Sequence, residues 1–207
     1  MTSKPSVTLV SILSEKLNLN GDQANLFVLQ KRLTWLGFRS KIESVGSAAE
    51  LAAANADFVL LGHGSLAAWK ACEQQWPTLA QDFASATSNV PGLAVGSGAT
   101  KVSLAIGHKL KQLSQPVSEF AVESIDNLDL LGYKYADVEP AVSQKNGEAL
   151  LTWLHGPLLA KNPQLADRFI ASILKAKGIL IDSFENENTR RVDELVAGVW
   201  QLEKPQD

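Results

Sequence analysis

The chain has 207 residues, of which 45% are hydrophobic and 20% charged, and its formal net charge is -3. This length suits one substantial core, so we expect a single domain over residues 1–207. The charge balance supplies no basic face that could displace counterions from phosphates, which excludes nucleic acid as an expected partner.

The rarer residue types exclude further classes of protein. Cys72 is the one cysteine, so the chain has no internal disulfide framework and no multi-cysteine metal cluster. Three scattered histidines without a close carboxylate cluster predict no metal site, and no motif predicts a cofactor. The N-terminus has no signal-peptide pattern, and no apolar run reaches the roughly 20 residues of a membrane span. We expect a cytoplasmic protein without membrane insertion.

The first half of the chain alternates between strand-like and helix-like segments. A β-branched apolar run at residues 7–13 predicts a strand, and apolar residues at helical spacing predict a helix over residues 26–36. Further strands are expected at residues 38–45 and 57–61, and further helices at residues 48–54, 66–75 and 77–86, the last with Pro77 in its first turn. The alternation favours an α/β fold with a mostly parallel sheet between two helical layers, a flavodoxin-like three-layer sandwich.

The second half contains a less regular stretch. We expect a strand at residues 92–95, a helix at 99–113, a small β extension within 116–145 that includes strand-like pieces at 120–125 and 128–133, and a strand at 149–154. Two amphipathic helices complete the chain, the first carrying Leu165, Phe169, Ile170, Ile173 and Leu174, the second Val192, Leu195, Val196 and Val199. His108 is placed near the end of the helix at 99–113, where its polarity suits the helix dipole.

Residues 90–99 have the outline of a nucleophile elbow, in which a strand runs into a glycine-flanked turn and then a helix. Gly96 stands at the apex, where a nucleophile would be needed. Two other loops follow predicted strands, and the functional groups of a parallel sheet collect beyond the carboxyl ends of its strands. These loops are Gly62-His63-Gly64-Ser65 and His155-Gly156-Pro157.

Four segments carry a resemblance to a known family: residues 14–19, 62–65 and 91–93 and, most specifically, the sequence HGPLLAKN at residues 155–162. Together they resemble the glutaminase subunit of lipid II isoglutaminyl synthase, from the cobyric-acid-synthase-like branch of class I glutamine amidotransferases. The resemblance spans about residues 7–173 and weakens between residues 116 and 145. It implies a class I glutamine amidotransferase-like fold and a Mur-ligase-like synthase as partner.

In that family a cysteine thiolate attacks the glutamine amide, a histidine acts as base, and backbone N–H groups stabilise the oxyanion. Carried over, the histidine falls on His155, the oxyanion loop on residues 62–65, and the cysteine on Gly96. The family's acidic and basic residues after that loop fall on Leu66 and Ala67, which cannot hold the charged ends of glutamine. The resemblance therefore implies a pseudoenzyme that lacks glutaminase activity and serves for binding of a partner or a ligand.

Several alternatives stay open. An active amidotransferase or hydrolase could use Ser97 with His155, or a nucleophile from a partner, although Ser97 could equally be a turn residue that bonds its own backbone. His155 could be a core histidine that steadies a strand end, and His63 could be a loop side chain that partly closes the disused site. Cys72 is expected to be a buried structural thiol. The chain could also form a homo-oligomer through its final helix.

The loop after the first strand contains two further polar candidates, Asn18 and Asp22. In the family this region lies close to the active-site side, so both side chains could line the pocket or a partner surface. For Asp22 the simpler interpretation is the polarity of a helix N-terminus.

Overall fold

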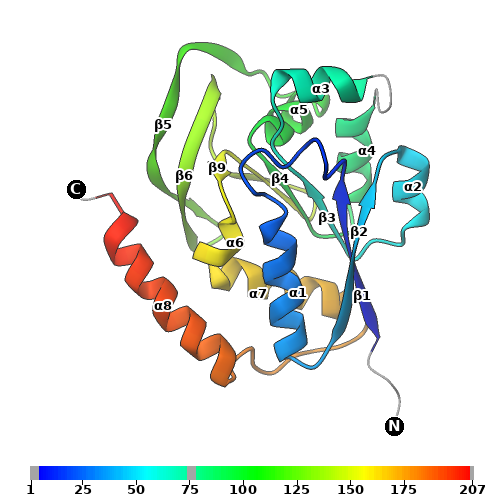
Figure 1. Ribbon diagram of the computed structural model, residues 1–207, viewed down its shortest axis with the longest axis vertical. Coiled ribbons are helices and arrows are strands. Elements are labelled where there is room, and N and C mark those ends of the chain that lie inside the picture. The colour runs from blue at the N-terminus through cyan, green and yellow to red at the C-terminus, as the bar shows by residue number, and fades with distance from the viewer. Residues whose placement is uncertain (1–4, 74–77, 206–207) are drawn as a thin grey trace.

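The computed structural model describes residues 5–73 and 78–205, and its centre is a six-stranded sheet with strand order β2-β1-β3-β4-β8-β7 (Figure 1). Its strands are β1 (Ser6–Ile12), β2 (Arg39–Val45), β3 (Phe58–Leu61), β4 (Gly92–Val95), β7 (Gln144–Asn146) and β8 (Ala149–Thr152). All neighbouring pairs are parallel except β7 with β8 at one edge. The expected α/β fold with a mostly parallel sheet is confirmed.

Helices cover both faces of this sheet, because side chains of successive strand residues point to opposite faces. In β3, Phe58 and Leu60 belong to one hydrophobic cluster, and Val59 and Leu61 belong to the other. The first cluster includes side chains of α1 (Ala24–Trp35), α6 (Leu158–Lys161) and α7 (Pro163–Ala176), and the second those of α2 (Ala48–Ala53), α3 (Leu66–Glu73), α4 (Leu79–Ala86) and α5 (Ser97–Ala105). The helices therefore bury their apolar faces against the two sides of the sheet.

The β extension is a long hairpin of β5 (Lys111–Ile125) and β6 (Leu128–Glu139), which stands beside the main sheet on the side away from α2 (Figure 1). Asp126 and Asn127 both have positive φ and join Ile125 to Leu128 as a two-residue turn, as tight hairpins require. The predicted strand at residues 149–154 is divided, because β9 (Leu154–His155) leaves the main sheet and pairs with β6. His155 therefore lies in the hairpin sheet, opposite Tyr133.

The predicted helix over residues 99–113 is wrong at both ends. It begins at Ser97 and ends at Ala105, and the chain turns at Gly107, whose φ is +89°. Lys111 then pairs with Glu139 in the hairpin, so the ladder of β5 outweighs the local helical pattern. His108 lies beyond the helix, with Nδ1 3.2 Å from Nε2 of Gln144. The expected helix start at Pro77 lies outside the described residues.

The last helix, α8 (Glu187–Glu203), runs along the layer formed by α1, α6 and α7 (Figure 1). The guanidinium of Arg32 on α1, only 3% exposed, holds it there: Nε lies 2.7 Å from Oδ1 of Asp167, and Nη1 lies 2.9 Å from Oδ1 of Asp193 on α8. Leu195, expected on the apolar face, is 67% exposed. Within residues 5–73 and 78–205, every helix is too short or too polar to cross a lipid bilayer.

Candidate functional site

The loops after β3 and β4 meet His155 at the carboxyl ends of the parallel strands, as the sequence predicted. Leu61 lies opposite Ala94, and Val95 opposite Thr152, so the residues that follow these strands are neighbours. The rings of His63 and His155 pack edge to face, with centroids 4.7 Å apart. They lie at the base of a cleft of about 920 Å³, and the β5–β6 hairpin forms one of its walls. This cleft is the candidate functional site.

Gly96 keeps the backbone of a nucleophile elbow. Its φ of +55° and ψ of -119° are strained for any residue with a side chain. A β-carbon at this position would lie 2.6 Å from Nδ1 of His63 and 2.8 Å from Nε2 of His155, and closer still to Cε1 of His155. The two imidazole rings therefore occupy the space in which the side chain of a nucleophile would begin.

Two backbone N–H groups beside the apex, those of Ser97 and Gly64, are bound by side chains. Nδ1 of His63 accepts a hydrogen bond from the N–H of Ser97 at 3.0 Å. Oγ of Ser97 accepts hydrogen bonds from the N–H of Gly64 at 3.0 Å and from Nε1 of Trp69 at 2.7 Å, and donates to the carbonyl of Gly64 at 2.9 Å. Ser97 therefore bonds the neighbouring oxyanion-type loop, not its own backbone, and its hydroxyl is fully engaged.

His155 is buried and hydrogen-bonded at both ring nitrogens. Its Nδ1 lies 2.6 Å from Nδ2 of Asn20, and its Nε2 lies 3.0 Å from the carbonyl oxygen of Tyr135. Because the carbonyl can only accept, Nε2 carries the proton and Nδ1 accepts from the amide. Burial lowers the pKa of His155 to about 4, with a contribution from His63, and the bond to Tyr135 opposes the shift. At neutral pH this imidazole is uncharged.

His63 is half-buried, and burial also lowers its pKa, against the opposing charge of Asp137. The remaining residues of its loop have structural contacts. A β-carbon on Gly62 would collide with the carbonyl of Leu17, so only glycine fits there. Ser65 caps α3 by accepting a hydrogen bond from the N–H of Ala68 at 3.1 Å.

Asp22 lies directly behind this loop and is fully buried. Its Oδ2 accepts a hydrogen bond from the N–H of His63 at 2.7 Å, and its Oδ1 has no partner among the described residues. Burial raises the pKa of Asp22 to about 6, although the bond from His63 lowers it. The N-terminal capping interpretation is wrong, because Gln23 occupies the N-cap position of α1, without a side-chain capping bond, and the Asp22 carboxylate instead supports the His63 loop. Asn18 accepts a hydrogen bond from the N–H of Gln23 at 2.9 Å.

Asn20 and the wall of the cleft were not singled out from the sequence. Asn20 holds His155 across 135 positions of chain, a contact that no local pattern encodes. Tyr133 and Tyr135 alternate along β6 and both line the cleft, as does the exposed Leu66. The alternating tyrosines were the available signal, since residues two apart in a strand share a face. Ala67 is not among the cleft-lining residues.

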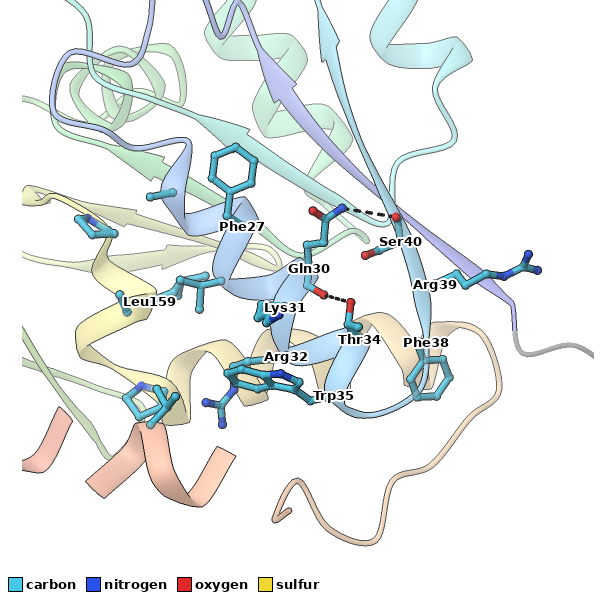
Figure 2. A pocket seen from close by; sticks show the side chains of 16 residues that line it. Phe27, Gln30, Lys31, Arg32, Thr34, Trp35, Phe38, Arg39, Ser40 and Leu159 are labelled. Atoms are coloured by element: carbon cyan, nitrogen blue, oxygen red, sulfur yellow. Dashed lines mark hydrogen bonds between the residues drawn. The ribbon is translucent and has the colours of Figure 1, made fainter. Parts of the chain in front are cut away.

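A second cavity of about 980 Å³ lies over the outer face of α1, where Figure 2 shows Phe27, Lys31 and Trp35. It is slightly larger than the cleft, but none of its described lining residues is Cys, His, Asp or Glu. Arg32 reaches it but is held by Asp167 and Asp193. The convergent polar groups of a functional site are in the cleft, not here.

Metal ligands and the cysteine thiol were the other candidates for chemistry. The described residues contain no group of three histidine, cysteine or acidic side chains that could hold a metal ion. Cys72 lies in α3 within the hydrophobic core, as expected, and burial raises the pKa of its thiol. A buried thiol with a raised pKa is a poor nucleophile.

The fold is that of class I glutamine amidotransferase-like proteins, a mostly parallel sheet flanked by helices. A solved structure from Thermoplasma acidophilum, described as a GMP synthase component, covers 84% of this chain and 98% of its own, with a TM-score of 0.57 and 13% identity. A glutamine amidotransferase from Thermotoga maritima (95% and 97% covered, 12% identity, TM-score 0.47) and PurLQS from the same organism (82% and 98%, 11%, 0.45) also match. The sequence itself matches no protein-family model and no curated protein. The likeness is one of fold.

Proposed function

We propose that this chain is a noncatalytic glutamine amidotransferase-like protein whose cleft binds a ligand or a partner. The main support for the proposal is the glycine at position 96. Because of it the elbow has no nucleophile, and the rings of His63 and His155 fill the space that a nucleophilic side chain would occupy. Glutamine hydrolysis by this fold needs a covalent attack on the amide carbon. A glycine at the apex removes that step.

The backbone donors give independent support. Stabilisation of a tetrahedral intermediate requires N–H groups that are free to bind the developing oxyanion. The N–H of Ser97 is instead bound to His63, and the N–H of Gly64 is bound to Oγ of Ser97. Glutamine could use neither donor unless these bonds broke first.

His155 is also unsuited to act as a base at neutral pH. A general base works best when its pKa lies near the operating pH and its lone pair faces the proton to be removed. The pKa of His155 is about 4, and its unprotonated nitrogen already accepts a bond from Asn20. A dyad of Ser97 and His155 would need both side chains to exchange their present partners.

The partner and the biological setting follow from the family resemblance. A Mur-ligase-like synthase would be the partner of a chain related to the glutaminase subunit of lipid II isoglutaminyl synthase, and a second copy of this chain is the other candidate. We place the protein in the cytoplasm as a single domain over residues 1–207. Its lone buried thiol fits a reducing compartment.

Covalent labelling tests the proposal. The purified protein would be treated with a chloroketone analogue of glutamine and, separately, with a serine-directed fluorophosphonate, and examined by intact mass and peptide mapping. We expect no adduct in the cleft with either reagent, and the same result for Ser97→Ala. An adduct on Ser97 that disappears in Ser97→Ala, or one on His155 that glutamine competes away, would overturn the proposal.

A further inference from the structure

The cleft collects exposed apolar side chains. Among the described residues, eleven large hydrophobic side chains are exposed, and six of them line this cleft: Leu19, Leu66, Leu104, Phe120, Tyr133 and Tyr135. Exposed apolar surface concentrated in one hollow is typical of a binding site, whereas isolated exposed side chains are ordinary. A volume of about 920 Å³ lies in the range of small-molecule pockets.

One wall of the cleft is aromatic. Phe120 of β5 lies directly opposite Tyr133 of β6 in the hairpin register, with ring centroids 5.3 Å apart, and Tyr135 follows on the same face of β6. These side chains are 41%, 39% and 39% exposed. The ring of Tyr135 also contacts that of His155, at 6.0 Å between centroids. Because the planes of Phe120 and Tyr133 lie at 81° to each other, these half-exposed rings offer both a face and an edge against which a planar aromatic group can pack.

The two sides of the cleft carry charges of opposite sign. Lys101 of α5 is exposed, with Nζ 5.6 Å from the ring centroid of Trp69, and no acidic side chain pairs with it in the part of the chain that the structure describes. Lys161, by contrast, is neutralised by its ion pair with Glu203. Asp137, on the hairpin two residues after Tyr135, brings a carboxylate into the cleft. With both cleft histidines uncharged at neutral pH, Lys101 is the cation that can receive an acidic group.

From these observations we infer that the cleft binds a planar aromatic small molecule that carries one anionic group. The ring packs against the wall formed by Phe120, Tyr133 and Tyr135, stacking on one of these rings and meeting another edge to face, and the anionic group pairs with Lys101. Asp137 disfavours a second negative charge at the hairpin side of the ligand. This inference rests on the proposed function, because it assigns a ligand class to the same noncatalytic cleft.

Matched probes test the inference by isothermal titration. Naphthoate has an aromatic ring system and one negative charge. Naphthalenemethanol has the aromatic rings without the charge, and cyclohexanecarboxylate has the charge without an aromatic ring. Naphthalenedicarboxylate adds a second negative charge to the aromatic rings. We expect naphthoate to bind about threefold to fivefold more tightly than naphthalenemethanol and the dicarboxylate, the size of an exposed ion-pair contribution, and about tenfold more tightly than cyclohexanecarboxylate, which lacks the stacking contact. Lys101→Met should reduce naphthoate to the affinity of the neutral alcohol.

Two more variants and a control sharpen the test. Tyr133→Leu should weaken the binding of naphthoate and of naphthalenemethanol by a similar factor, and Asp137→Asn should selectively strengthen the binding of the dicarboxylate. Lys70→Met, an exposed lysine on α3 outside the cleft lining, should leave every affinity unchanged.

Equal binding of naphthoate and the alcohol, an unchanged affinity in Lys101→Met, or no binding of any probe to folded protein would overturn the ligand assignment. Ammonia release from glutamine, measured on the same preparation, separates this failure from failure of the proposed function. Absent probe binding together with absent hydrolysis refutes only the ligand class. Hydrolysis of glutamine by the cleft refutes the noncatalytic proposal, whatever the probes do.

Discussion

Replacing the buried Asp22 by asparagine should change how the stability of the protein depends on pH. The amide keeps an oxygen that can accept the hydrogen bond from the N–H of His63 and removes a titrating group whose Oδ1 has no described partner. Burial holds the pKa of Asp22 at about 6 in the folded protein, against an ordinary value of 3.8. The substitution therefore tests whether this carboxylate is as unfavourably buried as the structure indicates.

The magnitude follows from linkage. Between pH 6 and 3.8 the folded protein holds a proton on Asp22 that the unfolded chain releases, so acidification through this range stabilises the folded state by about 3 kcal/mol through this group. His155 acts in the opposite direction. Its pKa falls from 6.5 to about 4 on folding, so acidification from pH 6.5 to 4 protonates mainly the unfolded chain and destabilises the folded state by about 3 kcal/mol. In the natural sequence these two contributions largely cancel.

Urea denaturation at intervals from pH 4 to 8 measures the effect. We expect the free energy of unfolding of Asp22→Asn, relative to the natural protein, to rise by about 2–3 kcal/mol as the pH increases from 4 to 7. The variant alone should lose stability steadily on acidification, because the contribution of His155 is no longer offset. Asp182→Asn, at a carboxylate outside the core, serves as the control. A difference between Asp22→Asn and the natural protein that stays constant with pH would refute this reasoning.

Three further substitutions, with Gly107→Ala as a matched control for the first, test the packing of the fold and of the apex by urea denaturation. Gly96→Ala should lower the free energy of unfolding by more than about 3 kcal/mol, because it adds a collision with two histidine rings to the strain of positive φ. Gly107→Ala, also at positive φ but in open space, should lower it by about 1–2 kcal/mol. Equal losses of stability would contradict the placement of the two histidine rings at the apex. Arg32→Met should cost about 3–5 kcal/mol, since it leaves the carboxylate of Asp167 without its cation, and a cost under about 1 kcal/mol would contradict that role. Leu93→Ala, in the centre of the sheet, should cost about 2–5 kcal/mol, and a neutral effect would contradict its complete burial.

The fold was predictable to the extent that it follows from local periodicity. The alternation of apolar strands and amphipathic helices identified the parallel sheet, and the rule that strand ends meet at one edge was enough to bring residues 62–65, Gly96 and His155 together. The end of α5 was not predictable in this way, because the pairing of Lys111 with Glu139 depends on the partner strand. Such long-range strand pairing overrides the local helical propensity of a segment.

The details of the candidate site depended on contacts that sequence patterns do not encode. The orientation of His63 toward the N–H of Ser97 follows from backbone geometry at a glycine apex. The bond from Asn20 to His155 joins segments far apart in the chain, and so does the support that Asp22 gives to His63. The residue types were enough to identify the loops that form the candidate site. The hydrogen bonds that these loops make could be identified only from the three-dimensional structure.

The central claim, that the cleft has no glutaminase chemistry, is tested most directly by one measurement. Glutamine labelled with ¹⁵N at its side-chain amide would be incubated at neutral pH with a stoichiometric amount of the protein, and the release of ¹⁵N-ammonium followed by NMR. We expect no ammonium above the protein-free rate, in the natural sequence and in His155→Ala alike. Ammonium release by the natural protein that His155→Ala abolishes would contradict the account.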